Sequence, residues 1–102
     1  MAQLIPLVSI VDLAEGEMVA GQVAGQDVLL CLVHGQFYAL ENRCSHAQQK
    51  LSSGRLSGHE VRCPLHGARF DVRSGACTRA PATAPIKTFS VTLEGGKVCL
   101  TI

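Results

Sequence analysis

The sequence predicts an all-β fold with a loop-rich segment inserted between its strands. Hydrophobic residues make up 47% of the 102-residue chain, so it can bury a core. With no Trp, one Tyr and three Phe, that core must consist mainly of Val, Leu, Ile and Ala, which suits many short strands. Two hairpin patterns support this fold class, and no convincing long amphipathic helix competes with them.

The two hairpin patterns flank the middle of the chain. Residues 27–33 and 36–40 are dense in apolar side chains and surround a His-Gly turn, which predicts the first hairpin. Residues 88–93 and 97–102 surround a Gly-containing turn, and the first of these segments alternates apolar and polar residues as a half-buried strand does. Strands are therefore expected on both sides of the middle segment.

One domain, residues 1–102, is predicted. The chain is too short for two independent cores, and no linker or internal repeat divides it. From about residue 42 to 85 it is rich in Gly, Ser, Pro and Arg and has only short apolar runs. Ser-Gly pairs at residues 57–58 and 74–75 predict two smaller hairpins there. This segment is therefore expected to form a subdomain inserted between the strands.

Charge is distributed unevenly along the chain. Residues 1–42 contain five acidic side chains and no Lys or Arg, whereas residues 43–79 contain seven basic side chains and two acidic ones. Such a bias can be an ordinary solvated face, or it can steer a charged partner, and the sequence leaves both interpretations open. In the second interpretation the middle segment docks onto acidic partner surfaces, and this association weakens with salt.

An apolar segment, residues 4–13, lies near the start of the chain. Pro6 and Asp12 interrupt it and no positively charged region precedes it, so we expect neither a secretory signal nor a membrane span. The protein is therefore expected in the cytoplasm, where reducing conditions disfavour disulfides. Its five cysteines are then expected to bind a metal or to be buried.

Two Cys/His pairs in the middle segment have the spacing of metal ligands. Cys44 and His46 are separated by one residue, Cys63 and His66 by two, and sixteen residues lie between the pairs. Each pair falls in a predicted loop that leaves a strand, so two loops can present four ligands to one centre. Zinc also accepts two Cys and two His, although its usual sites group Cys with Cys and His with His. A zinc-stabilised interaction module therefore remains an alternative.

The other cysteines and histidines receive no chemical role. Cys31 and Cys99 fall among Leu and Val in predicted strands, where we expect them to be buried. Cys77 lacks a His at metal spacing and is expected to be buried or harmlessly exposed. His34 and His59 occupy predicted turns, where solvent exposure explains both.

The order and spacing of the two Cys/His pairs resemble the Rieske family. The supporting runs are Cys63-Pro64-Leu65-His66-Gly67, Phe70-Asp71 and Ser74-Gly75. The resemblance covers nearly the whole chain and is closest to the ferredoxins of bacterial aromatic-ring-hydroxylating dioxygenases. It implies a Rieske-like antiparallel β-sandwich with a loop-rich cluster-binding subdomain inserted between strands. It also implies one [2Fe–2S] cluster, in which Cys44 and Cys63 bind one iron and His46 and His66 bind the other.

The resemblance also implies a soluble, low-potential carrier of single electrons that is not itself an enzyme. It would take an electron from a flavin-dependent NADH:ferredoxin reductase and deliver it to a terminal oxygenase with its own Rieske centre. We expect a monomer that binds neither nucleic acid nor membrane. The alternative is a relay subunit of an NADH-dependent nitrite reductase or another redox complex. A catalytic oxygenase is excluded, because it needs a further iron site on a much larger domain.

Departures from the high-potential respiratory members of the family imply a low reduction potential. Those members carry an extra Cys in each loop, where this chain has Gln49 and Leu65. They also use Ser and Tyr hydroxyls as donors toward the cluster, where this chain has Ala68 and Phe70. Without those hydrogen bonds the more negative reduced state is less stabilised, so we expect a potential on the order of −150 mV. Gly67 could let the backbone approach the cluster or could be an ordinary turn glycine.

Overall fold

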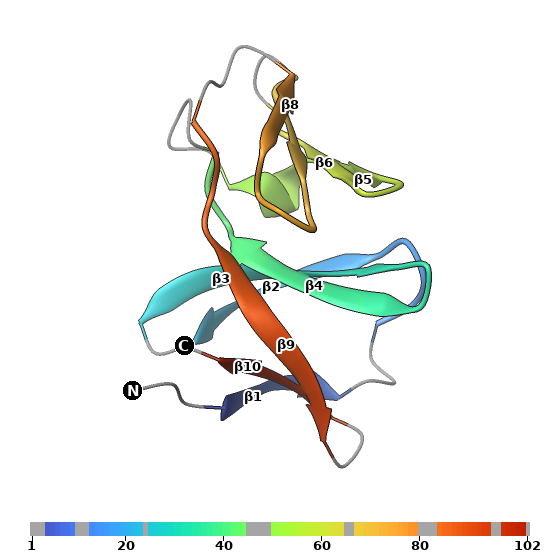
Figure 1. The fold of residues 1–102 in the computed structure, drawn as a ribbon, viewed down its shortest axis with the longest axis vertical. Helices are drawn as coiled ribbons and strands as arrows, with labels where there is room; N and C mark the ends of the chain where they lie inside the picture. The colour runs from blue at the N-terminus through green and yellow to red at the C-terminus, as the bar shows by residue number, and fades with distance from the viewer. Residues whose placement is uncertain are drawn as a thin grey trace.

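Two antiparallel sheets build the fold (Figure 1). The structure is a computed structural model and describes residues 4–9, 13–23, 25–44, 50–64, 67–79, 84–94 and 97–101. In these ranges the strands are β1 (Leu4–Ser9), β2 (Met18–Val23), β3 (Gln26–Val33), β4 (Gln36–Glu41), β5 (Arg55–Ser57), β6 (Glu60–Arg62), β7 (Arg69–Asp71), β8 (Cys77–Arg79), β9 (Thr88–Glu94) and β10 (Lys97–Thr101), and a short 3-10 helix, η2, spans Leu51–Ser53. The larger sheet has the order β1-β10-β9-β4-β3-β2 and the smaller one the order β5-β6-β7-β8. The all-β prediction is confirmed.

All four predicted hairpins are present. In the larger sheet β3 pairs with β4 and β9 pairs with β10. In the middle segment β5 pairs with β6 and β7 pairs with β8. The smaller sheet therefore lies between β4 and β9 in the sequence. The two segments that connect the sheets are joined where the Glu41 amide donates to the Lys87 carbonyl oxygen at 2.8 Å.

Strands β1 and β2 are not predicted by the sequence pattern. β1 pairs with β10, and its register shifts between Pro6 and Val8, because a proline cannot donate a hydrogen bond to the ladder and is tolerated at an edge or a bulge. β2 pairs with β3 and forms the other edge of the sheet. The pattern fails because Pro6 interrupts one apolar run and Gly21 weakens the strand signal of the other. In the described ranges no helix is long and apolar enough to cross a membrane.

The larger sheet folds over on itself, so that β1 approaches β2 (Figure 1). Its interior, which we call the sheet core, consists of Leu13, Val28, Leu30, Ala39, Phe89, Val98 and Leu100. These side chains are buried and come mostly from β3, β4, β9 and β10. Burial of each Val, Leu or Phe contributes about 1.5–3 kcal/mol to stability, so this core stabilises the folded-over sheet.

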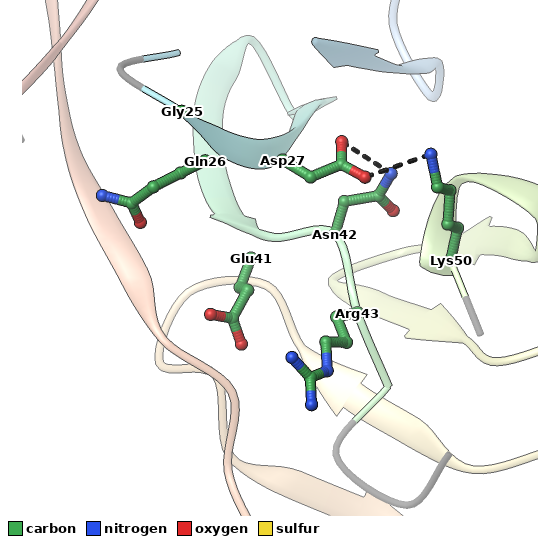
Figure 2. Close-up of a pocket in the computed structure, with 7 residues that line it drawn as sticks. All are labelled: Gly25, Gln26, Asp27, Glu41, Asn42, Arg43 and Lys50. Atoms are coloured by element: carbon green, nitrogen blue, oxygen red, sulfur yellow. Dashed lines mark hydrogen bonds and ion pairs between the residues drawn. The ribbon is translucent and has the colours of Figure 1, made fainter. Parts of the chain in front are cut away.

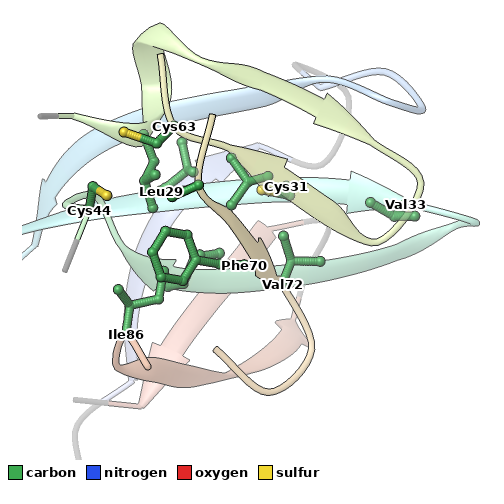
Figure 3. Close-up of a cluster of buried hydrophobic side chains, with 12 residues drawn as sticks. Leu29, Cys31, Val33, Cys44, Cys63, Phe70, Val72 and Ile86 are labelled. Carbon is green, nitrogen blue, oxygen red and sulfur yellow. The ribbon is translucent and has the colours of Figure 1, made fainter. Parts of the chain in front are cut away.

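A second cluster, which we call the junction core, joins the two sheets (Figure 3). Its members are Leu29, Cys31, Val33, Leu40, Cys44, Leu51, Val61, Cys63, Ala68, Phe70, Val72 and Ile86. β3 supplies both cores, because successive side chains of a strand point to opposite faces. Val28 and Leu30 enter the sheet core. Leu29, Cys31 and Val33 enter the junction core, so the smaller sheet packs on the outer face of β3.

The turn between β7 and β8 is held against the segment that precedes β9. The Ile86 amide donates to the Gly75 carbonyl oxygen at 2.9 Å. Gly75 has a φ of +78°, a conformation that L side chains rarely adopt. A Cβ at Gly75 would also overlap the carbonyl oxygen of Ile86. This contact therefore requires glycine for both its backbone conformation and its lack of a side chain.

Replacing Gly75 with Ala is expected to lower the thermal unfolding midpoint by roughly 10 °C more than the matched change Gly58→Ala. Gly58 also has a positive φ, +57°, but an added Cβ there would meet nothing within 4 Å. Relieving an overlap with a carbonyl requires backbone movement that costs about 2 kcal/mol, and 1 kcal/mol corresponds to about 4–8 °C in a domain of this size. Circular dichroism measures both midpoints, and equal midpoints would contradict the packing of Gly75 on Ile86.

Candidate metal centre

The first predicted ligand pair follows β4 in a segment whose two ends are joined by hydrogen bonds. Cys44 is buried, with 1% of its surface exposed. Near it, Asn42 Oδ1 accepts the Ser52 amide at 2.8 Å, and Asn42 Nδ2 donates to Ser52 Oγ at 3.1 Å. These two bonds bring together the residues on either side of the pair. His46 lies outside the described residues.

The second predicted pair follows β6 in a tight loop. Cys63, 1% exposed, donates its backbone N–H to the carbonyl oxygen of Ala68 at 2.7 Å, which closes the loop at its base. Gly67 has a φ of +73° and so supplies the left-handed conformation at the end of this loop. A Cβ at Gly67 would lie 3.2 Å from Arg62 Nε, so the arginine side chain also packs over this glycine. His66 lies outside the described residues.

The two predicted thiol ligands come from different loops and meet in the junction core. Cys44 and Cys63 both belong to this cluster, and Figure 3 shows their sulfur atoms at the end of it that lies away from Val33. No disulfide joins any of the five cysteines, as expected. The structure therefore brings the two thiols together, whereas the positions of the two predicted imidazoles remain a prediction.

Two buried thiols in apolar surroundings suit the ligands of a metal or of an iron–sulfur cluster. A buried thiolate without a positive partner is costly, and metal binding supplies that partner while it removes the thiol proton. Within the ranges that the structure describes, no group of three or more His, Cys, Asp or Glu side chains could hold a metal ion. A complete ligand set thus needs side chains from the remaining residues, which include His46 and His66.

Asn42 is a candidate positioning residue that the ligand spacing does not reveal. Among the residues that the structure describes, Asn42 is the one polar or charged residue that is buried, with 2% of its surface exposed. Its Nδ2 also lies 3.4 Å from Asp27 Oδ1, and Asp27 Oδ2 forms an ion pair with Lys50 Nζ at 3.3 Å (Figure 2). These residues line a hollow of about 370 Å³ beside the first loop. The signal in the sequence is a polar residue directly after an apolar strand and two residues before Cys44.

His34 and His59 contact each other between the two sheets. Their rings stack with centroids 5.1 Å apart, and the Tyr38 ring lies 5.9 Å from that of His59. His34 is exposed, as predicted for a residue in a turn. His59 is half-buried, so the prediction that it is exposed to solvent is wrong. The turn at His34 is held by Glu15, whose carboxylate accepts the amides of Gly35 and His34 at 2.8 and 2.6 Å, and these bonds lower the Glu15 pKa. The histidine pair therefore helps to join the sheets.

The other cysteines lie in strands. Cys31 in β3 and Cys99 in β10 are buried, as predicted. Burial raises the pKa of the Cys31 thiol to about 12, so this thiol stays protonated at neutral pH and is a poor metal ligand. Cys77 in β8 is partly buried and packs against the junction core. Cys44 and Cys63 differ from these three because they stand in loops, after the ends of β4 and β6.

Replacing Asn42 with Ala is expected to destabilise the first loop by about 1–3 kcal/mol, because the partly buried Ser52 amide loses its acceptor. The matched control is Ser53→Ala, which truncates an exposed side chain of the same helical turn. The thermal midpoint and the rate of metal release to a chelator should both change in the Asn42 variant only. Identical release rates in the two variants would show that Asn42 does not hold the loop.

Three comparisons relate the chain to known proteins. Residues 3–90 match the family described as Rieske [2Fe-2S] domain. The chain is 40% identical over 96 residues to the ferredoxin component of the naphthalene 1,2-dioxygenase system of Pseudomonas aeruginosa, which covers 94% of this chain and 92% of that protein. It matches the ferredoxin of carbazole 1,9a-dioxygenase from Nocardioides aromaticivorans IC177 with a TM-score of 0.92 and 32% identity over 95% of each chain. It also matches a structure described as the complex of reduced oxygenase and oxidized ferredoxin in carbazole 1,9a-dioxygenase, with a TM-score of 0.90 and 31% identity over 95% of this chain and 91% of that chain.

Proposed function

This chain belongs to the Rieske [2Fe–2S] domain family, and from this membership we propose that it is a ferredoxin that delivers single electrons to a terminal aromatic-ring-hydroxylating oxygenase. The observation that supports this most is the meeting of two buried thiols from separate loops in one core. The likeness to a dioxygenase ferredoxin along 94% of the chain gives the same assignment. The protein is thus an electron-transfer component and not an enzyme.

Four side chains are proposed to hold the cluster. Cys44 and Cys63 would bind one iron through thiolates, and their burial in a common core supports this. His46 and His66 would bind the other iron, and their places in the same two ligand motifs support this. When bound, a cluster with such mixed ligands takes up and releases one electron at a higher potential than a cluster held by four thiolates.

The chain itself keeps water away from the sulfur ligands and holds the two loops. The junction core surrounds both thiols with apolar side chains, and such a shell limits solvent access and so influences the reduction potential. Asn42 fixes the base of the first loop through Ser52, and the Cys63–Ala68 backbone bond fixes the base of the second.

The proposed electron donor is a flavin-dependent NADH:ferredoxin reductase, and the proposed acceptor is a terminal oxygenase with its own Rieske centre. The acceptor is supported by the solved complex of an oxygenase with a ferredoxin similar to this chain. The donor is supported by the membership of a close relative in a multicomponent dioxygenase system. The relatives serve systems for naphthalene and for carbazole, so the aromatic substrate is not set by the shared ferredoxin fold.

Residues 42–85 are proposed as the cluster-binding subdomain of one domain that spans residues 1–102. In support, β5 to β8 all fall within this segment, and the hydrogen bond between Glu41 and Lys87 joins the residues just outside it. A cytoplasmic location is proposed, because the NADH that supplies the electron is a cytoplasmic reductant and the cysteines form no disulfide.

Replacing Cys44 or Cys63 with Ser is expected to abolish the brown colour, the acid-labile sulfide and the paramagnetic signal that appears after dithionite reduction. The control Cys99→Ala should keep all three, because Cys99 is buried in β10 away from the ligand loops. Circular dichroism checks that each variant folds. Wild-type protein that is colourless and contains one zinc per chain would contradict the proposed cofactor.

The reduction potential is expected on the order of −150 mV, at the low end of the range for mixed Cys/His ligation. Ala68 and Phe70 are both fully buried and carry no hydroxyl that could donate toward the cluster. Ala68→Ser should raise the potential by about 40 mV, which corresponds to a hydrogen bond about 1 kcal/mol stronger in the reduced state. Ala76→Ser, on the exposed turn between β7 and β8, is the control. A wild-type potential well above zero in protein-film voltammetry would contradict the prediction.

A further inference from the structure

Four arginines occupy one row of register positions across the smaller sheet. Arg55 lies opposite Arg62, and Arg62 lies opposite Arg69. Arg69 in turn lies opposite Arg79, next to a register shift in the β7–β8 ladder. Residues directly opposite each other in antiparallel strands project to the same face. Arg55, Arg62 and Arg69 therefore project to one face across β5, β6 and β7, a span of about 10 Å for two strand spacings.

The row lies on the outer face of the smaller sheet. The neighbouring row, one residue along β5, β6 and β7, consists of Leu56, Val61 and Phe70, which are part of the junction core or pack against it. Alternation along these three strands turns Arg55, Arg62 and Arg69 away from this core. Arg55 and Arg62 are exposed, and the Arg69 side chain is 36% exposed.

The carboxylates on this face already have partners. Glu60 pairs with Arg69 at 3.6 Å, and Asp71 pairs with Arg73 at 2.8 Å. None of the ion pairs found in the described ranges includes Arg55 or Arg62. Like charges directly opposite each other destabilise a sheet, so the β5–β6 end of the row has uncompensated positive charge at a cost in stability.

The uncompensated end of the row lies beside the second ligand loop. Arg55 and Arg62 line a hollow of about 380 Å³ together with Cys63, Pro64 and Gly67. The Arg62 guanidinium lies against Gly67, because a Cβ there would be 3.2 Å from both Nε and Nη2. The excess charge is therefore placed next to the second ligand loop, which contains the proposed cluster ligands Cys63 and His66.

We propose that the arginine row is a docking face for carboxylates on a protein redox partner, with Arg55 and Arg62 as the residues that recognise them. This proposal rests on the proposed function, which requires protein partners. Arginine presents two parallel N–H donors that match a carboxylate. Exposed charges of this kind chiefly increase the rate at which oppositely charged partners meet in the correct orientation.

A protein partner fits this face better than a nucleic acid. The face formed by Arg55, Arg62 and Arg69 is only about 10 Å long, and Glu60 and Asp71 occupy the next outward-facing positions on β6 and β7. These carboxylates would repel a continuous phosphate backbone. The whole chain has a net charge of +1 and a pI of about 7.7, whereas nucleic-acid-binding domains usually have a pI above about 9.

The test compares the double variant Arg55→Gln/Arg62→Gln with the control Lys87→Gln/Lys97→Gln, which removes the same charge near β9 and β10 of the larger sheet. Each reduced protein is oxidised in stopped flow by ferricyanide, an anion, and by hexaamminecobalt(III), a cation. Each oxidant removes one electron. The ratio of the two rates cancels any change in driving force, so it reports the sign of the field near the site of electron transfer.

At low ionic strength the double variant should lower the anion-to-cation rate ratio by about tenfold or more, and the control should change it less than twofold. At 0.5 M salt the three proteins should converge, because exposed charges are then screened. Octaglutamate should slow the ferricyanide reaction of the wild type but not that of the double variant. The thermal midpoint of the double variant should equal or exceed that of the wild type, because a like-charge pair is removed.

Equal rate ratios in the double variant and the control would overturn the docking proposal, as would octaglutamate inhibition that survives in the double variant. Stronger inhibition by the oligonucleotide dT8, at a tenfold lower concentration than octaglutamate, would assign the face to nucleic acid instead and also overturn it. Protein without a cluster would contradict the proposed function. Fluorescence anisotropy of labelled octaglutamate would still measure the binding to the arginine row in that case, so the two failures are distinguishable.

Discussion

The burial of β3 on both faces is the constraint on which the two sheets depend. Its alternate side chains enter two different cores. A slip of one residue would therefore turn Val28 and Leu30 toward the junction core and Leu29 and Cys31 toward the sheet core. The same alternation continues in β4, where neighbouring residues also divide between the two cores. The backbone that leads into the first ligand loop is therefore fixed from both sides before that loop begins.

The ligand loops are held by a different kind of interaction from the sheets. Apolar packing reaches Cys44 and Cys63, but the loop bases are closed by hydrogen bonds. One of these uses a buried asparagine side chain, and a buried polar group that loses its partner costs more than an average hydrogen bond contributes. Asn42 consequently links the geometry of the first loop to β3 through Asp27, although it is not a member of either predicted ligand pair.

The sequence predicted the strands of four hairpins but missed β1 and β2. β2 was missed although it forms a hairpin with β3, because Gly21 weakens its strand pattern. The hairpins could be found because apolar runs and turn residues lie next to one another in the chain. β1 could not, because its pairing with β10 joins opposite ends of the sequence across a proline-induced register shift. The spacing predicts Cys44 and Cys63 as ligands, and the structure places both in one core, whereas Asn42 and the stacking of His34 on His59 arise only when separate segments meet. The arginines were visible as a basic excess, but their alignment needed the strand register.

Two electrostatic effects of opposite sign act on the proposed cluster, and they differ in their sensitivity to salt. The absence of hydroxyl donors at Ala68 and Phe70 is proposed to lower the reduction potential, and it would act within a buried region that ions do not enter. The arginine row favours the more negative reduced state, but Arg55 and Arg62 are exposed, and such charges are screened over about 8–10 Å in ordinary buffers. The buried effect should therefore dominate the potential, while the exposed row should dominate the rate of encounter. Substitutions that change the charge of the docking face would therefore change the rate of encounter with the partner much more than the reduction potential.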